Sequence, residues 1–254
     1  MDLGRQIREM VRNLGASLVG IAPVERFKGA PAGHHPEDFI SEAKSVICIG
    51  IKILKASIEW DRLLLNSELV PEGARRAILQ EYFYVYTGYD LINYMLDTAA
   101  LRIGNTLEDL KFKTIAIPST YSKVYRHLQD MIPGKYGLFS HRHAAVRAGL
   151  GEFGLNNIVV TPEYGSRVRF ASIITSVELE PNEVLKEKVC TGESCGLCIN
   201  ECPAHAISIV PDSDMKSFYY NPVTRTKVDT CFESQVPLYC RGKCIRVCPV
   251  GSHV

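Results

Sequence analysis

The first 180 residues carry apolar positions in the two periods that helices and strands require. Residues 3–13 place an apolar stripe along one helical face, which Gly15 would end. Three short apolar runs have the length of buried strands, and two of them stop at a proline: 16–22, 45–51 and 112–117. Helical patterns occupy the stretches between and after these runs: 36–43, 72–103 with a predicted break near Gly88, 121–131 and 141–148.

Two more strands are predicted at 157–161 and 167–175, on either side of a turn at 162–166. The turn contains Pro and Gly, so we expect the two strands to pair as an antiparallel hairpin. Helices and strands therefore mix along residues 1–180. The pattern predicts an α+β sandwich of helices around one sheet, followed by a separate segment, 181–254.

Eight of the nine cysteines lie between residues 190 and 248, in two groups that each end in Cys-x3-Cys-Pro. In bacterial ferredoxins, three closely spaced cysteines hold one 4Fe–4S cluster, and the cysteine before proline ligates the other cluster. The predicted ligands therefore cross between the groups. One cluster takes Cys190, Cys195, Cys198 and Cys248, and the other takes Cys202, Cys231, Cys240 and Cys244.

Disulfides and zinc are the alternative uses of these cysteines. A disulfide framework needs an oxidising compartment, and the N-terminal residues show no secretory signal. Zinc ribbons pair two Cys-x2-Cys knuckles, and only Cys195 and Cys198 have that spacing. The sequence thus favours two 4Fe–4S clusters. Cys48, the ninth cysteine, lies in an apolar run and is expected to pack as a small hydrophobe.

Composition is ordinary for a globular protein, with 46% hydrophobic and 22% charged residues among 254. A formal net charge of +1 gives no broad basic field for a nucleic-acid partner. No apolar run approaches the roughly 18 residues that span a bilayer. We expect a cytoplasmic protein, because thiols stay reduced there and clusters can be assembled.

The densest glycine spacing outside the cysteine groups is Gly149-x-Gly151-x-x-Gly154. A dinucleotide-binding turn follows a strand and opens a helix, whereas here a predicted helix precedes the glycines and a strand follows. We therefore reject a dinucleotide site. Closely spaced glycines still let backbone approach a ligand or a cluster.

The run RAGLGEFGLNNIVVTPEYGSRVRFASIITSVELEP, with the two cysteine groups after it, resembles the epoxyqueuosine reductase and reductive dehalogenase superfamily. The segments IREMVRNLGASLVGIAPVERF and AKSVICIGIKIL resemble it too, so the likeness covers nearly the whole chain. It implies a base-off cobalamin between a nitroreductase-like sheet domain (1–180) and a ferredoxin-like two-cluster module (181–254). The TPEYGSRVR turn is closer to the dehalogenase branch. The implied cofactor contacts are Gly149, Gly151, Gly154, Asn156, Asn157 and Arg167.

Three features depart from the superfamily pattern. Queuosine-branch enzymes carry an aspartate proton donor shortly before the Gly-rich run, and residues 135–143 contain no Asp or Glu. Six residues follow Cys248, with none of the C-terminal repeat that would support tRNA binding. The export signal of respiratory dehalogenases is missing as well. We therefore expect a compact third kind of member whose substrate does not carry over.

A reductase acting through Co(I) needs a proton source near the corrin. The candidates are Tyr121, Tyr125, Tyr136, His141 and His143, each of which also has a structural interpretation. Arg167 and Arg169 alternate along a predicted strand, so they either grip corrin groups or lie on a solvated face. Several ring side chains are expected in the core and cleft wall, or as a platform for a flat cofactor: Tyr82, Phe83, Tyr84, Tyr86 and Tyr89. His34 and His35 are expected in a solvated loop.

The predicted function is electron passage through two 4Fe–4S clusters to a bound corrinoid. Such a protein is either a reductase with its own small-molecule substrate or a reductase of corrinoid proteins, for example an inactive Co(II) methyltransferase. The alternatives are a ferredoxin-type carrier without cobalamin and an epoxyqueuosine-reductase-like tRNA-modification enzyme. We expect ferredoxin or flavodoxin as the electron donor, no membrane partner, no nucleic-acid partner, and no histidine below the cobalt.

Overall fold

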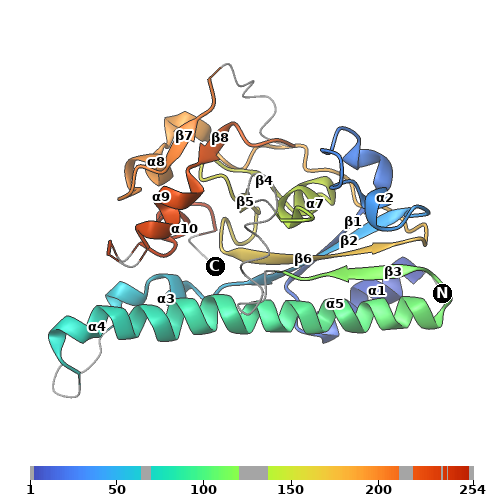
Figure 1. Ribbon diagram of the computed structural model, residues 1–254, viewed down its shortest axis with the longest axis horizontal. Coiled ribbons are helices and arrows are strands. Elements are labelled where there is room, and N and C mark those ends of the chain that lie inside the picture. Colours follow the sequence, from blue (N-terminus) through green and yellow to red (C-terminus); the bar gives the residue numbers. More distant parts are fainter. Residues whose placement is uncertain are drawn as a thin grey trace. The chain divides into compact units, whose positions relative to one another are not determined.

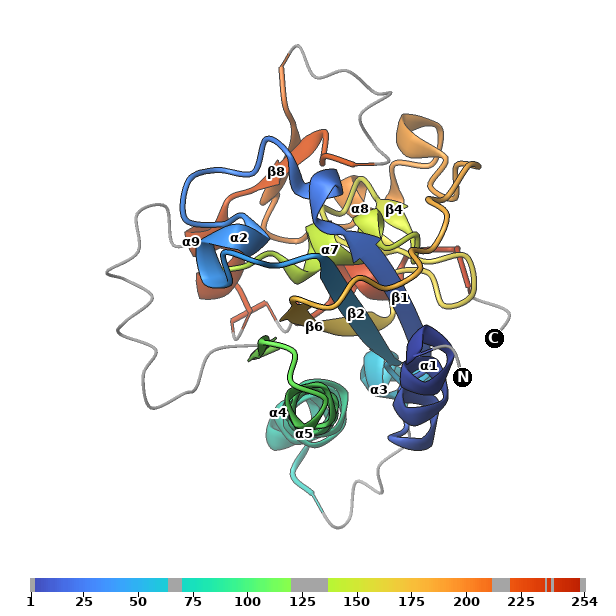
Figure 2. The same ribbon diagram turned by 90° about the vertical axis from the view of Figure 1, so that its right-hand side faces the viewer.

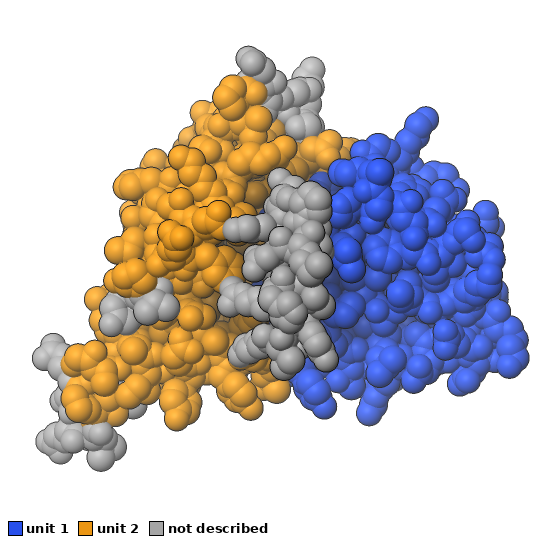
Figure 3. Space-filling model, viewed as in Figure 1, with its two compact units in different colours: residues 1–51, 93–150, 169–184 blue, residues 52–92, 151–168, 185–254 orange. Residues whose placement is uncertain are grey.

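The computed structural model describes residues 3–63, 70–119, 137–211, 220–235, 237, 238 and 240–251. The chain divides into two compact units, each assembled from three stretches (Figure 3). Unit 1 comprises residues 1–51, 93–150 and 169–184, and unit 2 comprises residues 52–92, 151–168 and 185–254. The unit that holds the cysteine groups thus also takes in two earlier stretches. The predicted domain division at residue 180 rests on the sequence pattern and stays a prediction.

Unit 1 is built around a four-stranded sheet with strand order β1–β2–β6–β3. β1 (Leu18–Pro23) pairs antiparallel with β2 (Ser45–Lys52), and β3 (Thr114–Ile117) pairs antiparallel with β6 (Val168–Thr175). All of β2 except its last residue is buried, as a continuous apolar run predicts for a strand covered on both faces. Cys48 lies in this strand, fully buried, which confirms its prediction as a core side chain.

Helices cover both faces of this sheet. α1 (Leu3–Asn13) and α5 (Leu91–Asp109) lie on one face, and α7 (His141–Arg147) lies on the other (Figures 1 and 2). α1 has the predicted bounds and buries Ile7 and Val11. The chain turns after it at Gly15, whose φ of +86° is the left-handed conformation that glycine adopts easily.

Two short helices lie in the loop region between β1 and β2. They are η1 (Val24–Phe27) and α2 (Pro36–Phe39), the second of which is shorter than the predicted 36–43. His35 caps α2: its ring accepts a hydrogen bond from the Glu37 N–H at 3.3 Å. The His34 Nδ1–H donates to the Leu138 carbonyl at 2.8 Å. Both histidines therefore have partners within the chain.

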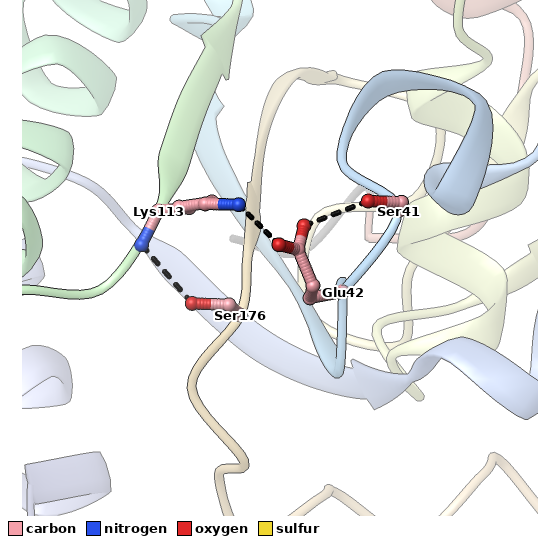
Figure 4. Close-up of polar contacts among 4 residues, drawn as sticks. All are labelled: Ser41, Glu42, Lys113 and Ser176. Atoms are coloured by element: carbon pink, nitrogen blue, oxygen red, sulfur yellow. Dashed lines mark hydrogen bonds and ion pairs between the residues drawn. The ribbon is translucent and has the colours of Figure 1, made fainter.

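Polar contacts tie the start of β3 to the end of β6 and to the segment before β2 (Figure 4). The Lys113 N–H donates to Ser176 Oγ at 3.0 Å, next to the paired residues of the two strands. The Lys113 ammonium pairs with Glu42, and this hydrogen bond, helped by one from Ser41, lowers the pKa of Glu42 to about 2. Because the pair is exposed, we expect it to add little stability.

Residues 72–109 form one helical run, so the predicted break near Gly88 is wrong. α4 (Glu72–Leu79) leads into a π-helical segment, η3 (Gln80–Asp90), and then into α5. Tyr82, Phe83 and Tyr86 are 66%, 40% and 61% exposed, which contradicts their predicted core position.

Unit 2 contains two small sheets. β4 (Glu152–Phe153) pairs with β5 (Val159–Val160), and β7 (Ile207–Ile209) pairs with β8 (Thr224–Thr226). Besides α4 and η3, its elements are single turns or short helices: α3 (Lys55–Ile58), η2 (Trp60–Arg62), η6 (Gly192–Ser194), α8 (Leu197–Asn200), α9 (Val228–Glu233) and α10 (Lys243–Arg246).

The predicted hairpin between 157–161 and 167–175 is wrong. β5 pairs with β4, whereas β6 lies between β2 and β3 in the large sheet. β6 is eight residues long and pairs along its edges with β2 and β3, whereas β5 has only two residues to offer for pairing.

The mixture of helices and sheets agrees with the α+β prediction. The nitroreductase-like and ferredoxin-like assignments within it stay predictions. Among the described helices, none combines the length and the apolar character needed to cross a lipid bilayer.

Candidate metal centre

Four cysteines line one cavity in unit 2: Cys190, Cys195, Cys198 and Cys248, called here the first cysteine set. Cys190 precedes η6, Cys195 follows it, and Cys198 lies within α8. Gly196 makes the turn between these two elements with a φ of +57°, a conformation that a side chain would strain. The loop can therefore wrap tightly, and Cys248, after α10, supplies the fourth thiol to the same cavity.

The remaining four cysteines, Cys202, Cys231, Cys240 and Cys244, form the second cysteine set. Cys202 belongs to a small apolar cluster with Ala206 and Ile207, against which Cys231 and Cys244 pack. Cys202 and Cys240 line a second cavity, of about 360 Å³. Each thiol of this set therefore shares a cavity or a packed cluster with Cys202.

Electrostatics couple the thiols within each set, and one coupling crosses between the sets, because the charge of Cys198 also raises the pKa of Cys244. Burial, and then the negative charges of Cys190 and Cys248, raise the pKa of Cys198 to about 11. Burial also raises the pKa of Cys240, and the charges of Cys231 and Cys202 raise it further. Thiolates within one set repel one another, and positively charged iron would offset this repulsion.

The donor chemistry of both sets fits a 4Fe–4S cluster, which takes four cysteine thiolates. No three His, Cys, Asp or Glu side chains of the described residues are grouped to hold a single metal ion. A four-iron cluster takes its cysteines on different irons, so its ligands lie farther apart than those of one ion. Ligation of clusters by these eight cysteines stays a prediction.

The Gly-rich run packs closely against the chain itself. A Cβ on Gly151 would lie 2.5 Å from the Val160 carbonyl oxygen, and one on Gly154 would lie 2.5 Å from Val160 Cγ2. At Gly149, with φ +73°, a Cβ would lie 2.0 Å from the Glu183 carbonyl oxygen. Gly149 and Gly151 thus allow close approach of backbone to backbone, and Gly154 allows close approach of the backbone to the Val160 side chain. Contact of these glycines with a cofactor stays a prediction.

The polar residues predicted as cofactor contacts join segments that carry the cysteines. Asn156 Nδ2 donates to Ser166 Oγ at 2.7 Å and more distantly, at 3.4 Å, to the Cys244 carbonyl. Asn157 has a φ of +58°, and its Nδ2 donates to Thr226 Oγ1 at 3.3 Å. Each amide therefore has partners within unit 2.

Arg167 is 7% exposed and bonds to two carbonyl oxygens of unit 2. Its Nη1 donates to Ile53 at 3.2 Å, and its Nη2 donates to Gly251 at 2.7 Å. Gly251 follows Cys248 by three residues. The guanidinium thus fixes the segment behind the last cysteine, and a role in gripping corrin stays a prediction.

Glu152 is a site residue that sequence reasoning missed. Its side chain is fully buried, and its Oε1 accepts hydrogen bonds from the backbone N–H groups of Val189 and Cys190 at 2.6 and 2.5 Å. Burial raises the pKa of this carboxyl group, although the two hydrogen bonds act in the opposite direction. The only sequence signal was an acidic residue between two glycines in an otherwise apolar run.

The two histidines predicted as proton donors are engaged within unit 1. His141 Nε2–H donates to the Pro118 carbonyl at 2.8 Å, and Nδ1 lies 2.9 Å from Ser172 Oγ. Burial lowers the pKa of His141, and because the Pro118 carbonyl oxygen can only accept a hydrogen bond, Nε2 carries a proton. His143 Nδ1 lies 2.7 Å from the hydroxyl of Ser140, which caps α7. The other candidates lie outside the described residues: Tyr121, Tyr125 and Tyr136.

Sequence comparison finds relatives in two groups of enzymes, although no family model matches the chain. The chain is 25% identical over 173 residues to an epoxyqueuosine reductase of Bacillus anthracis, a match covering 68% of this chain and 38% of that protein. It is 42% identical over 240 residues to a tetrachloroethene reductive dehalogenase of Dehalobacter restrictus, covering 82% of this chain and 39% of that protein. The chain thus spans about two fifths of the length of these relatives.

Solved structures from both groups share the fold. Epoxyqueuosine reductase from Bacillus subtilis aligns with a TM-score of 0.60 at 18% identity, covering 98% of this chain and 65% of that one. A reductive dehalogenase whose structure suggested a mechanism for B12-dependent dehalogenation aligns with a TM-score of 0.58 at 20% identity, covering 98% and 32%. The chain is therefore a relative of the epoxyqueuosine reductases and reductive dehalogenases, as its Gly-rich run and two cysteine groups predict.

Proposed function

We propose that this chain is an iron–sulfur oxidoreductase that holds two 4Fe–4S clusters and acts on a corrinoid. The observation that carries the proposal is the division of eight cysteines into two sets of four within unit 2. One-electron transfer is the chemistry that such clusters supply when bound. We further propose that the sheet of unit 1 is nitroreductase-like and that the cysteine segment is ferredoxin-like.

The chain's own residues would prepare each set for a cluster in two ways. Tight turns fix the thiols: Gly196, with φ +57°, precedes α8, and Gly242, with φ +85°, precedes α10. Apolar side chains limit access of water to them. Leu155 and Val223 form a buried cluster against which Cys198 packs. Low solvent exposure is one of the factors that set cluster reduction potentials.

Likeness to the reductive dehalogenases supports the corrinoid part of the proposal, since one of them is described as B12-dependent. The residues predicted to contact the corrin add no support of their own, because they already pack against or hydrogen-bond to other residues of the chain: Gly149, Gly151, Gly154, Asn156, Asn157 and Arg167. This engagement favours one alternative, a ferredoxin-type carrier without its own cobalamin.

Location and partners complete the proposal. None of the nine cysteines is in a disulfide, which suits a reducing compartment, and we place the protein in the cytoplasm. A small one-electron carrier, such as a ferredoxin or flavodoxin, would be the donor. The acceptor would be the chain's own corrinoid, with a small-molecule substrate, or the corrinoid of a partner protein.

Cobalamin titration tests the corrinoid part directly. Co(II) cobalamin is added to the anaerobically reconstituted protein, and the electron paramagnetic resonance (EPR) spectrum of the cobalt is recorded. Base-off binding should remove the nitrogen hyperfine pattern of the free cofactor. A nitrogen pattern retained in the bound form would contradict base-off binding. A spectrum identical to that of free cobalamin would contradict cobalamin binding and support the alternative, a ferredoxin-type carrier without its own cobalamin. Cluster-free protein serves as the control for binding that needs no cluster.

A further inference from the structure

Glu152 is a buried carboxyl group with an unusual distribution of hydrogen bonds. Its Oε1 accepts both backbone N–H groups, from Val189 and Cys190. Its Oε2 is buried and has no hydrogen-bond partner among the described residues. Burying a carboxyl group without full hydrogen bonding is unfavourable. An apolar residue would fill this place at lower cost unless the two N–H groups require an acceptor.

The backbone around Glu152 is held in place on both sides. Glu152 pairs with Val160 in the β4–β5 ladder. The neighbouring Gly151 allows that ladder to close, since a Cβ there would meet the Val160 carbonyl oxygen. Gly154 turns the chain directly after β4, and its N–H donates to the Ile158 carbonyl at 2.8 Å. The carboxyl group is therefore presented from a rigid hairpin.

The same hairpin contacts Cys190 a second time. The backbone N–H groups of Leu155 and Gly192 act as hydrogen-bond donors to the Cys190 sulfur, which lowers its pKa against the larger, opposite effect of burial. Leu155 and Glu152 are three residues apart, and both come from the Gly-rich run. The Gly-rich run thus contacts Cys190 twice: the Glu152 carboxyl group accepts its backbone N–H, and the Leu155 N–H donates to its sulfur.

We propose that Glu152 is a positioning residue that holds Cys190 in the first cysteine set by accepting the N–H groups of Val189 and Cys190. This inference rests on the proposed function, because it presupposes that the set binds a cluster. It gives the Gly-rich run a role that needs no contact with a corrin: its glycines close a hairpin that presents Glu152. Groups that orient metal ligands in this way commonly affect both occupancy and the properties of the metal.

Variants of Glu152 test whether its side chain acts as the hydrogen-bond acceptor of the two N–H groups. In Glu152→Ala both N–H groups lose their acceptor, and the cluster of the first set should be lost, leaving about four irons per chain instead of about eight. In Glu152→Gln the amide oxygen still accepts both N–H groups, so the iron content and the EPR spectrum of the reduced protein should match the wild type. Glu163→Ala, which removes an exposed carboxylate from the same segment, is the matched control.

The outcomes are distinct. A Glu152→Ala protein with about eight irons and a wild-type spectrum would overturn the inference, as would a Glu152→Gln protein that loses the cluster. If Glu152→Ala does not fold, Glu152→Asp replaces it: the shorter side chain cannot reach both N–H groups, so the first-set signal should weaken, and a wild-type signal would overturn the inference. Wild-type protein without iron would instead overturn the proposed function.

Discussion

Replacing Arg167 by Met tests whether this buried side chain stabilises the fold or serves as a cofactor contact. The guanidinium donates to the Ile53 and Gly251 carbonyl oxygens at 3.2 and 2.7 Å. Methionine keeps much of the apolar stem, so the substitution removes mainly the charged donors. The two carbonyl oxygens would lose these partners.

The expected loss of stability follows from these two hydrogen bonds. A hydrogen bond to a charged group contributes about 1.5–3 kcal/mol, so losing both should cost about 3–6 kcal/mol. For a chain of this size, each kcal/mol lowers the melting temperature by about 2–4 °C. Taking the low end of the energy range, the melting temperature should fall by at least about 6 °C.

Thermal unfolding followed by circular dichroism, under anaerobic conditions, measures this fall. Arg225→Met is the control, because Arg225 is exposed and its contacts with carbonyl oxygens are long, at 3.4 and 3.5 Å. We expect its melting temperature to stay near the wild-type value. An Arg167→Met protein that melts like the wild type but no longer binds cobalamin would refute the structural role and restore Arg167 as a cofactor contact.

Three further predictions concern a glycine, a histidine and the ninth cysteine. Gly165→Ala should lower the melting temperature more than Gly33→Ala. Both glycines have positive φ, but only at Gly165 would a Cβ clash with the chain, 2.0 Å from the Val250 carbonyl oxygen. Equal falls in melting temperature would contradict this reasoning. Burial lowers the pKa of His141, so the unfolded chain binds more protons and stability should fall as the pH drops below about 6.5. His141→Gln should flatten this pH dependence of the melting temperature, and an unchanged slope would argue against it. Cys48 is fully buried in β2 and its thiol pKa is raised by burial, so Cys48→Ala should keep the wild-type iron content; loss of iron would assign Cys48 to a cluster.

The sequence predicted those parts of the fold whose cause is local. β2 is an apolar run of strand length, β6 lies within the predicted strand 167–175, and α1 carries its apolar stripe and its terminal glycine within 13 residues. The pairing of β5 with β4 was not predictable in this way, because turn residues do not reveal which partner covers a strand. The π-helical stretch η3 was not predicted, because no residue in it signals that geometry.

In the candidate site, too, local features were predictable and contacts between distant residues were not. Cysteine spacing gave the crossed grouping, and the cavities and packing of unit 2 group the thiols compatibly with it. Glu152 could not be assigned a role, because its partners Val189 and Cys190 are 37 and 38 residues away along the chain. Arg167 was expected either to grip corrin groups or to lie on a solvated face, and its hydrogen bonds to the Ile53 and Gly251 carbonyl oxygens could not be predicted, because those residues are far from it along the chain.

Iron content and EPR spectra of cysteine variants test the crossed assignment most directly. Anaerobically purified wild-type protein should contain about eight irons per chain, and each single Cys→Ala variant should keep about four. The reduced Cys202→Ala protein should give the spectrum of Cys231→Ala, and Cys248→Ala should give that of Cys190→Ala. Cys202→Ala with the spectrum of Cys190→Ala would contradict the crossed assignment, and zinc in place of iron would contradict the clusters themselves.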